Sequence, residues 1–128
     1  CAQIVIPARL ADEEFVASSI QFSVPTLAAD QILELVKICH ARGIVIIWFG
    51  AKEPQDYTSR YDSWRYIEQM PYLPKTEKVL SSLLDMRIPL TFNQQDCELI
   101  ADIIVEVVGE VVGGVVSKLT DEVVAEDL

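Results

Sequence analysis

The sequence predicts an α+β domain, a small mostly antiparallel sheet with helices packed on one face. Residues 18–24 alternate apolar and polar side chains, which is the period of a half-buried strand. Residues 26–42 repeat apolar side chains every three or four positions, as an amphipathic helix does. The short apolar run at 44–49 favours a further strand. Strands and a helix in this order indicate a sheet that is covered by helices.

The first predicted element is a strand at 3–10 (QIVIPARL), which is rich in isoleucine and valine. Pro7 has no amide hydrogen to donate, so this strand is expected at an edge or at a bulge. A polar turn at 12–14 separates it from the run at 18–24, and the two runs could form a hairpin.

A helix is predicted after Pro25, with Thr26 as its N-cap and Arg42 in its last turn. Gly43 is expected to close it. The buried stripe is predicted to contain Ile32, Leu35, Val36 and Cys39. His40, the only histidine, lies in the last turn, where a surface position that suits the helix dipole is favoured over a role as a base or ligand.

The run at 44–49 (IVIIWF) is predicted to be a strand that is buried on both faces. Residues 51–72 show no periodicity and mix turn formers, aromatic residues and charges. Long irregular segments of compact domains often carry function, so candidate site residues are expected here.

A short helix is predicted after Leu73-Pro74, with Thr76 as its N-cap. Its buried stripe is predicted to contain Val79, Leu80, Leu83 and Leu84. Pro89 favours an extended segment at 87–90.

Asn93 and Asp96 resemble a capping pair for a long final helix. Gly109 is expected to interrupt this helix and Gly113-Gly114 to end it, which leaves residues 115–128 as a short acidic tail. The inner face of the helix is predicted to contain Cys97, Ile100, Ile104, Val107 and Val111.

Length and composition limit the possible functions. The chain has 128 residues, which predicts one domain over 1–128. Its apolar fraction is 51%, yet no run approaches the roughly 20 apolar residues of a membrane span, so no membrane partner is expected. Excess apolar surface then indicates a face that another domain or a second subunit covers.

The net charge of -10 argues against a nucleic-acid partner. The acidic residues after Arg87 are interpreted as a solvated helical face rather than a metal site.

The cysteines Cys1, Cys39 and Cys97 form no CxxC pair, so neither a zinc site nor a disulfide is indicated. Cys39 and Cys97 are predicted to be small core residues in a reducing compartment, the cytoplasm. The first residue leaves two explanations open, a lipoprotein matured at that cysteine or a segment of a longer polypeptide. The strand-like run that follows directly favours the segment.

Several segments in order resemble the C-terminal small domain of the DegT/DnrJ/EryC1/StrS aminotransferases, over roughly residues 15–112. These segments are SSIQFSV, HARGIVI, an aromatic loop, LPKTEKVLSSLLDMRIPLT and DCELIADIIVEVV. Leu73, Pro74, Thr76 and Glu77 match a Leu-Pro-x-Thr-Glu element of the family. Residues 85–91 (DMRIPLT) depart from the Ser-Leu-Pro segment of relatives, and the histidine of the preceding loop is absent. These departures leave the substrate open.

The resemblance implies a fold-type I enzyme that depends on pyridoxal phosphate (PLP) and aminates a keto sugar, in most relatives one linked to a nucleotide. The small domain would form part of the substrate cleft and of the subunit contact in a homodimer. The PLP site and the catalytic lysine would lie in an N-terminal large domain, so this chain alone would neither bind PLP nor transaminate. No lysine of the chain is therefore assigned a catalytic role.

Five residues are candidates for substrate binding: Arg60, Trp64, Arg65, Tyr66 and Arg87. The arginines offer planar forks for a carboxylate or phosphate, and the two aromatic residues offer stacking faces. Alternatively, the aromatic residues attach the loop to the core and the arginines pair with nearby acids, which is the favoured reading for each arginine. A rival hypothesis is a stand-alone ferredoxin-like module for ligand binding or dimerisation, which fold class alone does not exclude.

Overall fold

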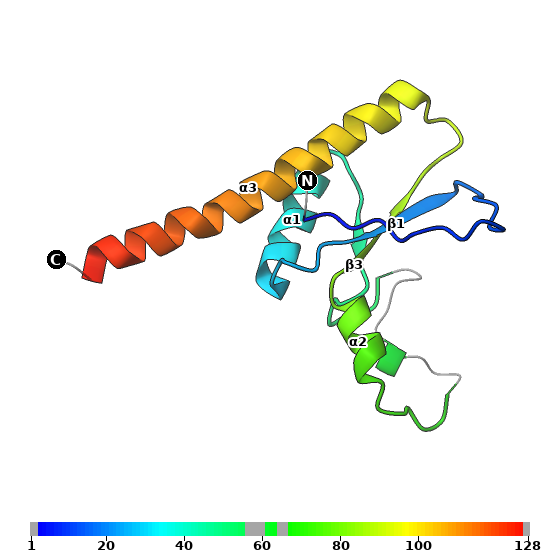
Figure 1. Ribbon diagram of the computed structural model, residues 1–128, viewed down its shortest axis with the longest axis horizontal. Helices are drawn as coiled ribbons and strands as arrows, with labels where there is room; N and C mark the ends of the chain where they lie inside the picture. Colours follow the sequence, from blue (N-terminus) through cyan, green and yellow to red (C-terminus); the bar gives the residue numbers. More distant parts are fainter. Residues whose placement is uncertain (1–2, 56–60, 64–66, 127–128) are drawn as a thin grey trace.

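The structure, a computed structural model, describes residues 3–55, 61–63 and 67–126. Its elements follow one another as β1 (Ser19–Ser23), α1 (Ala29–Ala41), β2 (Ile47–Trp48), the 3-10 helix η1 (Tyr61–Ser63), α2 (Pro74–Leu80), β3 (Leu83–Arg87) and α3 (Gln94–Glu126). Figure 1 shows the course of the chain through these elements. The strands of the described residues form one antiparallel sheet in the order β1-β3-β2. The predicted α+β class with a small antiparallel sheet is confirmed.

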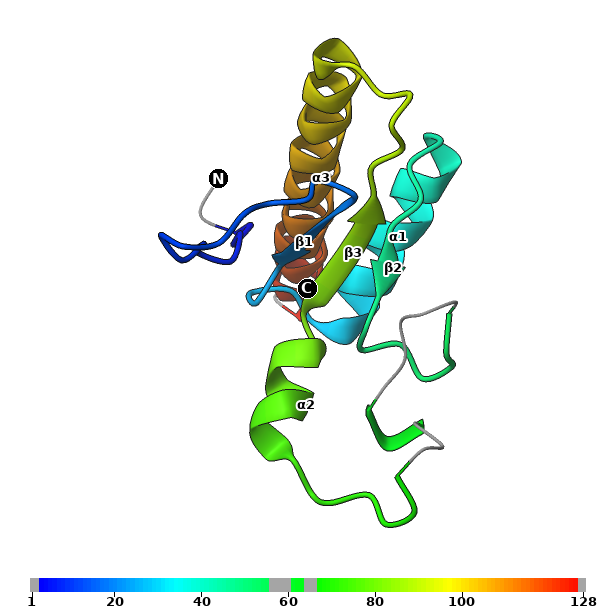
Figure 2. The ribbon, with the colours of Figure 1, turned by 90° about the vertical axis from the view of Figure 1, so that its right-hand side faces the viewer.

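Two long helices cover one face of the sheet. Phe22 lies opposite Leu84 across the β1–β3 ladder, and Trp48 lies opposite Leu84 across the β2–β3 ladder. Residues opposite one another project from the same face, so these three side chains point together into the core. Figure 2 shows α1 and α3 on that side of the sheet, with α2 beyond the end at which β3 begins.

The core lies between this face and the two helices. Leu84 and Leu35 are fully buried, as are Val107 and Val108 of α3. Each such side chain contributes about 1.5–3 kcal/mol on burial, so the α1–sheet–α3 contact holds the domain together. The predicted inner stripe of α1 is confirmed, with Ile32, Leu35 and Cys39 buried and Val36 half-buried.

The C-terminal end of α1 agrees with the prediction, but its N-terminal end does not. Gly43 takes a φ of +83°, the left-handed conformation that closes a helix. At the start, Thr26 is not the N-cap. The Leu27 N–H donates to the Val24 carbonyl in a turn, and Leu27 is buried. This turn delays the helix to Ala29, and Gln31 Oε1 accepts the Ala28 N–H at 2.7 Å.

The predicted strand at 3–10 is wrong. Only Val5 pairs, in a bridge with Ser23 whose two N–H···O distances are 2.8 Å each. Pro7 follows two residues later and cannot donate to a ladder, so the pairing stops there.

The predicted burial of 44–49 on both faces is also wrong. Ile44, Ile46 and Trp48 are buried, whereas the side chain of Val45 is 62% exposed. The cause is that helices cover one face of the sheet, and that β2 is an edge strand of the described sheet.

The segment after residue 72 differs from its prediction at both ends. Leu73 is the N-cap of α2 and Pro74 its first residue, so Thr76 lies inside the helix. Val79 is 60% exposed and does not belong to a buried stripe.

Leu83 and Leu84 are not helical, because β3 begins at Leu83. The Trp48 indole N–H donates to the Ser81 carbonyl at 2.9 Å. A longer helix would need this carbonyl as the acceptor of a main-chain hydrogen bond. The strand then runs to Arg87, so the extended segment predicted at 87–90 begins earlier.

The long final helix begins as predicted. The Asn93 N–H donates to Asp96 Oδ2 and the Asp96 N–H donates to Asn93 Oδ1, both at 2.9 Å. The predicted end at Gly113-Gly114 is wrong, and so is the interruption at Gly109, because α3 continues through all three glycines to Glu126. Most of the predicted acidic tail is therefore helical. A helical glycine costs about 1 kcal/mol relative to alanine, and the buried valines on both sides of Gly109 offset that cost.

The predicted inner face of α3 is partly confirmed. Ile104, Val107 and Val111 are buried, Ile100 is half-buried, and Cys97 is exposed. The core prediction for Cys97 is thus wrong, because the first turns of α3 lie over an open part of the sheet.

Candidate functional site

The structure locates one of the five predicted substrate-binding residues. Arg87 is the last residue of β3, is exposed, and lies opposite Ser19 in the ladder. Because side chains alternate along a strand, Arg87 projects from the face opposite to Met86 and the core. Arg60, Trp64, Arg65 and Tyr66 lie outside the described residues. Whether the five come together as one site stays a prediction.

Tyr61 is an anchor of the irregular segment that the sequence reasoning did not single out. Its side chain is 6% exposed, and its hydroxyl accepts the Leu73 N–H at 3.4 Å. A small cavity of about 70 Å³ joins Tyr61 to Phe49, Gly50 and the second half of α2. The contact ties Tyr61 to the start of α2. The sequence gives no signal that distinguishes Tyr61 from the other aromatic residues of this segment.

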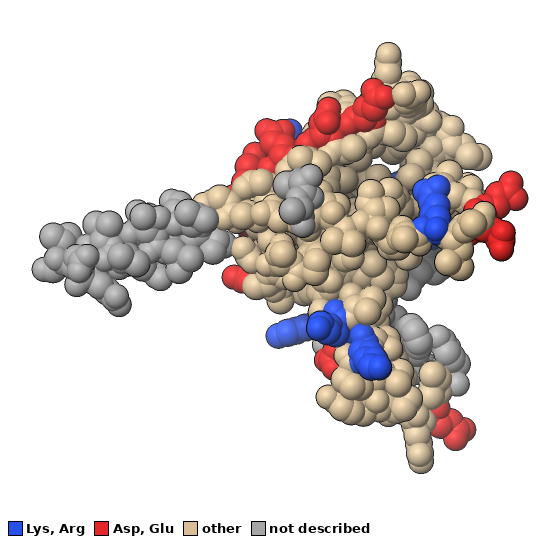
Figure 3. Space-filling model, viewed as in Figure 1, with Lys and Arg blue, Asp and Glu red and all other residues tan. Residues whose placement is uncertain are grey.

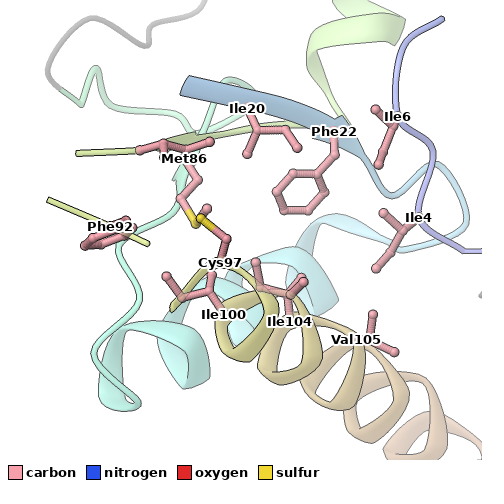
Figure 4. A pocket seen from close by; sticks show the side chains of 12 residues that line it. Ile4, Ile6, Ile20, Phe22, Met86, Phe92, Cys97, Ile100, Ile104 and Val105 are labelled. Atoms are coloured by element: carbon pink, nitrogen blue, oxygen red, sulfur yellow. The ribbon is translucent and has the colours of Figure 1, made fainter. Parts of the chain in front are cut away.

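An apolar groove of about 220 Å³ lies between the sheet, the N-terminal segment and the first half of α3. Figure 4 shows the side chains of the N-terminal segment, of β1 and β3, and of the first half of α3 pointing into it. Its lining is Ile4, Ile6, Ile20, Phe22, Met86, Ile88, Phe92, Cys97, Ile100, Ala101, Ile104 and Val105.

Local structure explains how these residues meet. Ile20 and Phe22 alternate with polar residues on β1, and Met86 lies opposite Ile20, so all three face α3. Ile100 and Ile104 are four residues apart on α3 and therefore lie on the same side of that helix. The Val5–Ser23 bridge holds the N-terminal segment against the edge of β1, which brings the neighbouring Ile4 and Ile6 to the groove.

The groove has a closed floor and an open rim. Phe22 and Ile104 on the floor are 4% and 7% exposed, whereas Ile6 and Val105 on the rim are 59% and 45% exposed. No Asp, Glu, Lys, Arg or His side chain belongs to the lining, so the groove has no group for ion-pair chemistry. It can accept apolar groups, and covering it would be favourable by about 25 cal/mol per Å² of apolar surface.

Sequence reasoning anticipated an uncovered apolar face but not its location. The signal was the apolar fraction of 51%, which exceeds what a small core needs. The groove joins residues near position 5 to residues near position 100, and no local pattern links these segments.

The described cysteines have opposite surroundings. Cys97 is exposed at the groove, and Cys39 is fully buried between α1 and the core. Burial raises the pKa of the Cys39 thiol to about 11, and the nearby Arg42 guanidinium opposes the shift. Cys39 is therefore a protonated core residue rather than a nucleophile.

Charged side chains lie on the outside of the molecule. Figure 3 shows acidic side chains along the outer side of α3, in agreement with the predicted solvated face, and Glu98, Asp102 and Glu110 are exposed. Glu106 pairs with Arg42 at 2.9 Å.

Among the described residues, no group of three or more His, Cys, Asp or Glu side chains is arranged to hold a metal. None of the helices in this part of the chain is both long and apolar enough to cross a bilayer.

Comparison of the chain with protein-family models, with curated proteins and with solved structures finds no match. The resemblance of residues 15–112 to the aminotransferase small domain therefore stays a prediction.

Proposed function

We propose that this chain is the C-terminal small domain of a PLP-dependent aminotransferase that resembles the DegT/DnrJ/EryC1/StrS family. In the complete enzyme it forms one wall of the substrate cleft and part of the subunit contact of a homodimer. The substrate is a keto sugar, and the catalytic lysine lies in an N-terminal large domain.

The observation that carries this proposal is the apolar groove with its open rim. A self-sufficient domain of this size has no need to leave Ile6, Phe92 and Val105 exposed around one cavity. A domain of a larger enzyme does leave such a surface apolar, because a neighbouring domain or subunit buries it. Ile4 and Ile6 belong to the groove, so the chain that precedes them in the proposed enzyme reaches this face.

The order of the elements supports the same proposal. The Leu-Pro-x-Thr-Glu segment begins α2, with Pro74 at the first helical position, where its missing N–H is harmless. The following DMRIPLT segment supplies the end of β3 and the connection to α3. The motif thus sets the path from α2 to the sheet rather than building a reactive centre.

The described lysines do not fit a PLP site. Lys37, Lys52, Lys75 and Lys78 are all exposed, and none lies in the apolar groove. A Schiff-base lysine needs a partly desolvated setting and an acidic partner for the cofactor ring. PLP therefore binds in another part of the proposed enzyme. The proposed enzyme lies in the cytoplasm, where the buried Cys39 stays reduced.

Arg87 is the described residue that we assign to substrate. It is exposed on the sheet face away from α1 and α3, at the end of a central strand. A guanidinium there can hold the carboxylate of an amino donor in a bidentate pair.

The rival hypothesis of a ferredoxin-like module requires a four-stranded βαββαβ unit, and the described sheet has three strands.

The test uses the product of the complete reading frame beside this chain alone. We expect the complete protein to show the absorbance of bound PLP and this chain to show none. In the complete enzyme, Arg87→Ala should raise the KM for the amino donor about tenfold, the loss of one charge-assisted pair, with PLP binding unchanged.

Arg42→Ala is the matched control, because Arg42 is also a surface arginine but pairs with Glu106 on α3. It should leave the KM unchanged. A PLP absorbance band from the isolated chain would contradict the proposal, and an unchanged KM for Arg87→Ala would assign that arginine to structure.

A further inference from the structure

The outer edge of β1 is incompletely paired. Ile88 donates to the Ser18 carbonyl and Val24 to the Ser82 carbonyl, so the even-numbered residues of β1 direct their main-chain groups toward β3. Ser19 and Gln21 direct theirs to the opposite edge, because this direction alternates along a strand. Ser23 pairs with Val5 there, but within the described residues no main-chain group pairs with Ser19 or Gln21 on that edge.

A cavity of about 260 Å³ lies at this unpaired edge. Residues 6–9 form its outer wall and β1 residues 19–21 its inner wall, with Glu13 and Phe15 at one side. Pro7 explains the space, since a proline cannot donate to β1 and the segment departs from the strand after the Val5 bridge. The cavity adjoins the apolar groove, since Ile6 and Ile20 line both, but Arg9, Ser19 and Gln21 line this cavity alone.

Arg9 presents a positioned guanidinium to this cavity. Its Cζ lies 3.6 Å from the centroid of the Phe15 ring, a stacked cation–π arrangement that leaves the N–H edge of the fork available. No ion pair of Arg9 is found within the described residues. The neighbouring Glu13 is held in a turn, where its Oε2 accepts the Leu10 N–H and its own N–H donates to the Leu10 carbonyl, both at 3.1 Å.

We propose that this edge of β1 binds a short extended peptide segment that ends in a carboxylate. The main-chain groups of Ser19 and Gln21 pair with the peptide backbone, as in strand addition. The Arg9 guanidinium takes the carboxylate in a charge-assisted pair. Residues 19–21 span about 10 Å, which suits two or three peptide residues. Two features of the site match this ligand. The unpaired edge of β1 matches an extended peptide backbone, and the Arg9 guanidinium matches a carboxylate.

The peptide site does not depend on the aminotransferase proposal, because the residues that make its contacts, Arg9, Ser19 and Gln21, belong to neither the apolar groove nor the predicted substrate set. The probe is the acetylated tripeptide Ala-Val-Ala with a free C-terminal carboxylate, titrated into the isotopically labelled protein. We expect the amide resonances of Ser19 and Gln21 to shift. The same peptide with an amidated C-terminus should bind at least tenfold more weakly.

Arg9→Ala should weaken binding of the free acid to the level of the amidated peptide. The substitution removes the guanidinium of the ion pair, whereas amidation removes its carboxylate. Arg9 is exposed, and Arg42→Ala is the control for loss of a surface arginine. The comparison of acid with amide uses the unmodified protein and does not depend on how the variants fold. Equal binding of acid and amide, or no shift at Ser19 and Gln21, would overturn the proposal. Shifts of these amides with protein concentration alone would overturn it in favour of edge pairing between two copies.

Discussion

At the residue scale, Cys39 and Cys97 show how position in the fold decides the chemistry of a side chain. Both fall on apolar stripes of the sequence, yet one is fully buried and the other is exposed at the groove. Burial disfavours the thiolate, so the pKa of Cys39 rises from 9.0 to about 11. The consequence is a stability that depends on pH in the alkaline range.

The direction of that dependence follows from the raised pKa. The folded state holds the Cys39 proton more tightly than the unfolded state, so its stabilising contribution is complete below pH 9.0 and is lost as the pH rises toward 11. From pH 8 to 11 the loss should be about 2 kcal/mol. Urea unfolding at several pH values should show a steeper alkaline decline for the wild type than for Cys39→Ala. Cys97→Ala is the control and should decline like the wild type. Equal slopes for all three proteins would mean that Cys39 titrates normally.

At the element scale, two glycines have opposite surroundings although the sequence shows each as a simple break. A Cβ on Gly50 would lie 2.7 Å from the Trp48 indole, whereas a Cβ on Gly109 would meet nothing within 4 Å. The indole cannot move freely, because its N–H is bonded to the Ser81 carbonyl.

Alanine at these positions should therefore shift stability in opposite directions. Gly109→Ala should stabilise the protein by up to about 1 kcal/mol, because alanine is the better helix former. Gly50→Ala should destabilise it by about 1–3 kcal/mol, because the indole must shift and its hydrogen bond to the carbonyl is strained or lost. Thermal unfolding monitored by circular dichroism separates the two outcomes. A stable Gly50→Ala variant would show that the indole has room to move.

The contrast between α1 and β3 shows which elements a sequence can predict. The stripe of α1 and the Asn93–Asp96 cap depend on neighbours within four residues, and both were predicted. Leu83 and Leu84 fit a helix and a strand equally well by local pattern. Their state is decided by pairing with β1 and by the hydrogen bond that the Trp48 indole donates to the Ser81 carbonyl, 33 positions later in the sequence. Contacts of that kind leave no periodic trace.

The candidate site divides in the same way. Arg87 was predicted from its side-chain chemistry, and the structure places it on an accessible face of β3. The apolar groove was anticipated only as excess apolar composition, because its walls come from both ends of the chain. The cavity beside Arg9 was not anticipated, since it depends on where Pro7 makes the chain depart from β1.

At the scale of the whole molecule, the open groove determines how the domain meets other bodies. Val105 is 45% exposed on the rim, and Leu33 is 57% exposed on α1 and does not line the groove. Changing either residue to glutamate should leave the isolated domain folded, because both side chains already reach solvent. The two variants differ only in the surface that receives the charge.

Val105→Glu should weaken binding of an apolar fluorescent dye to the isolated chain about tenfold, since a carboxylate at the rim opposes entry of apolar groups. Leu33→Glu should leave dye binding unchanged. In the complete protein of the proposed enzyme, Val105→Glu should also lower the melting temperature by several degrees, because the covering domain must then bury the charge. Equal effects of the two variants on dye binding and on melting would show that the groove is ordinary exposed surface with no covering partner.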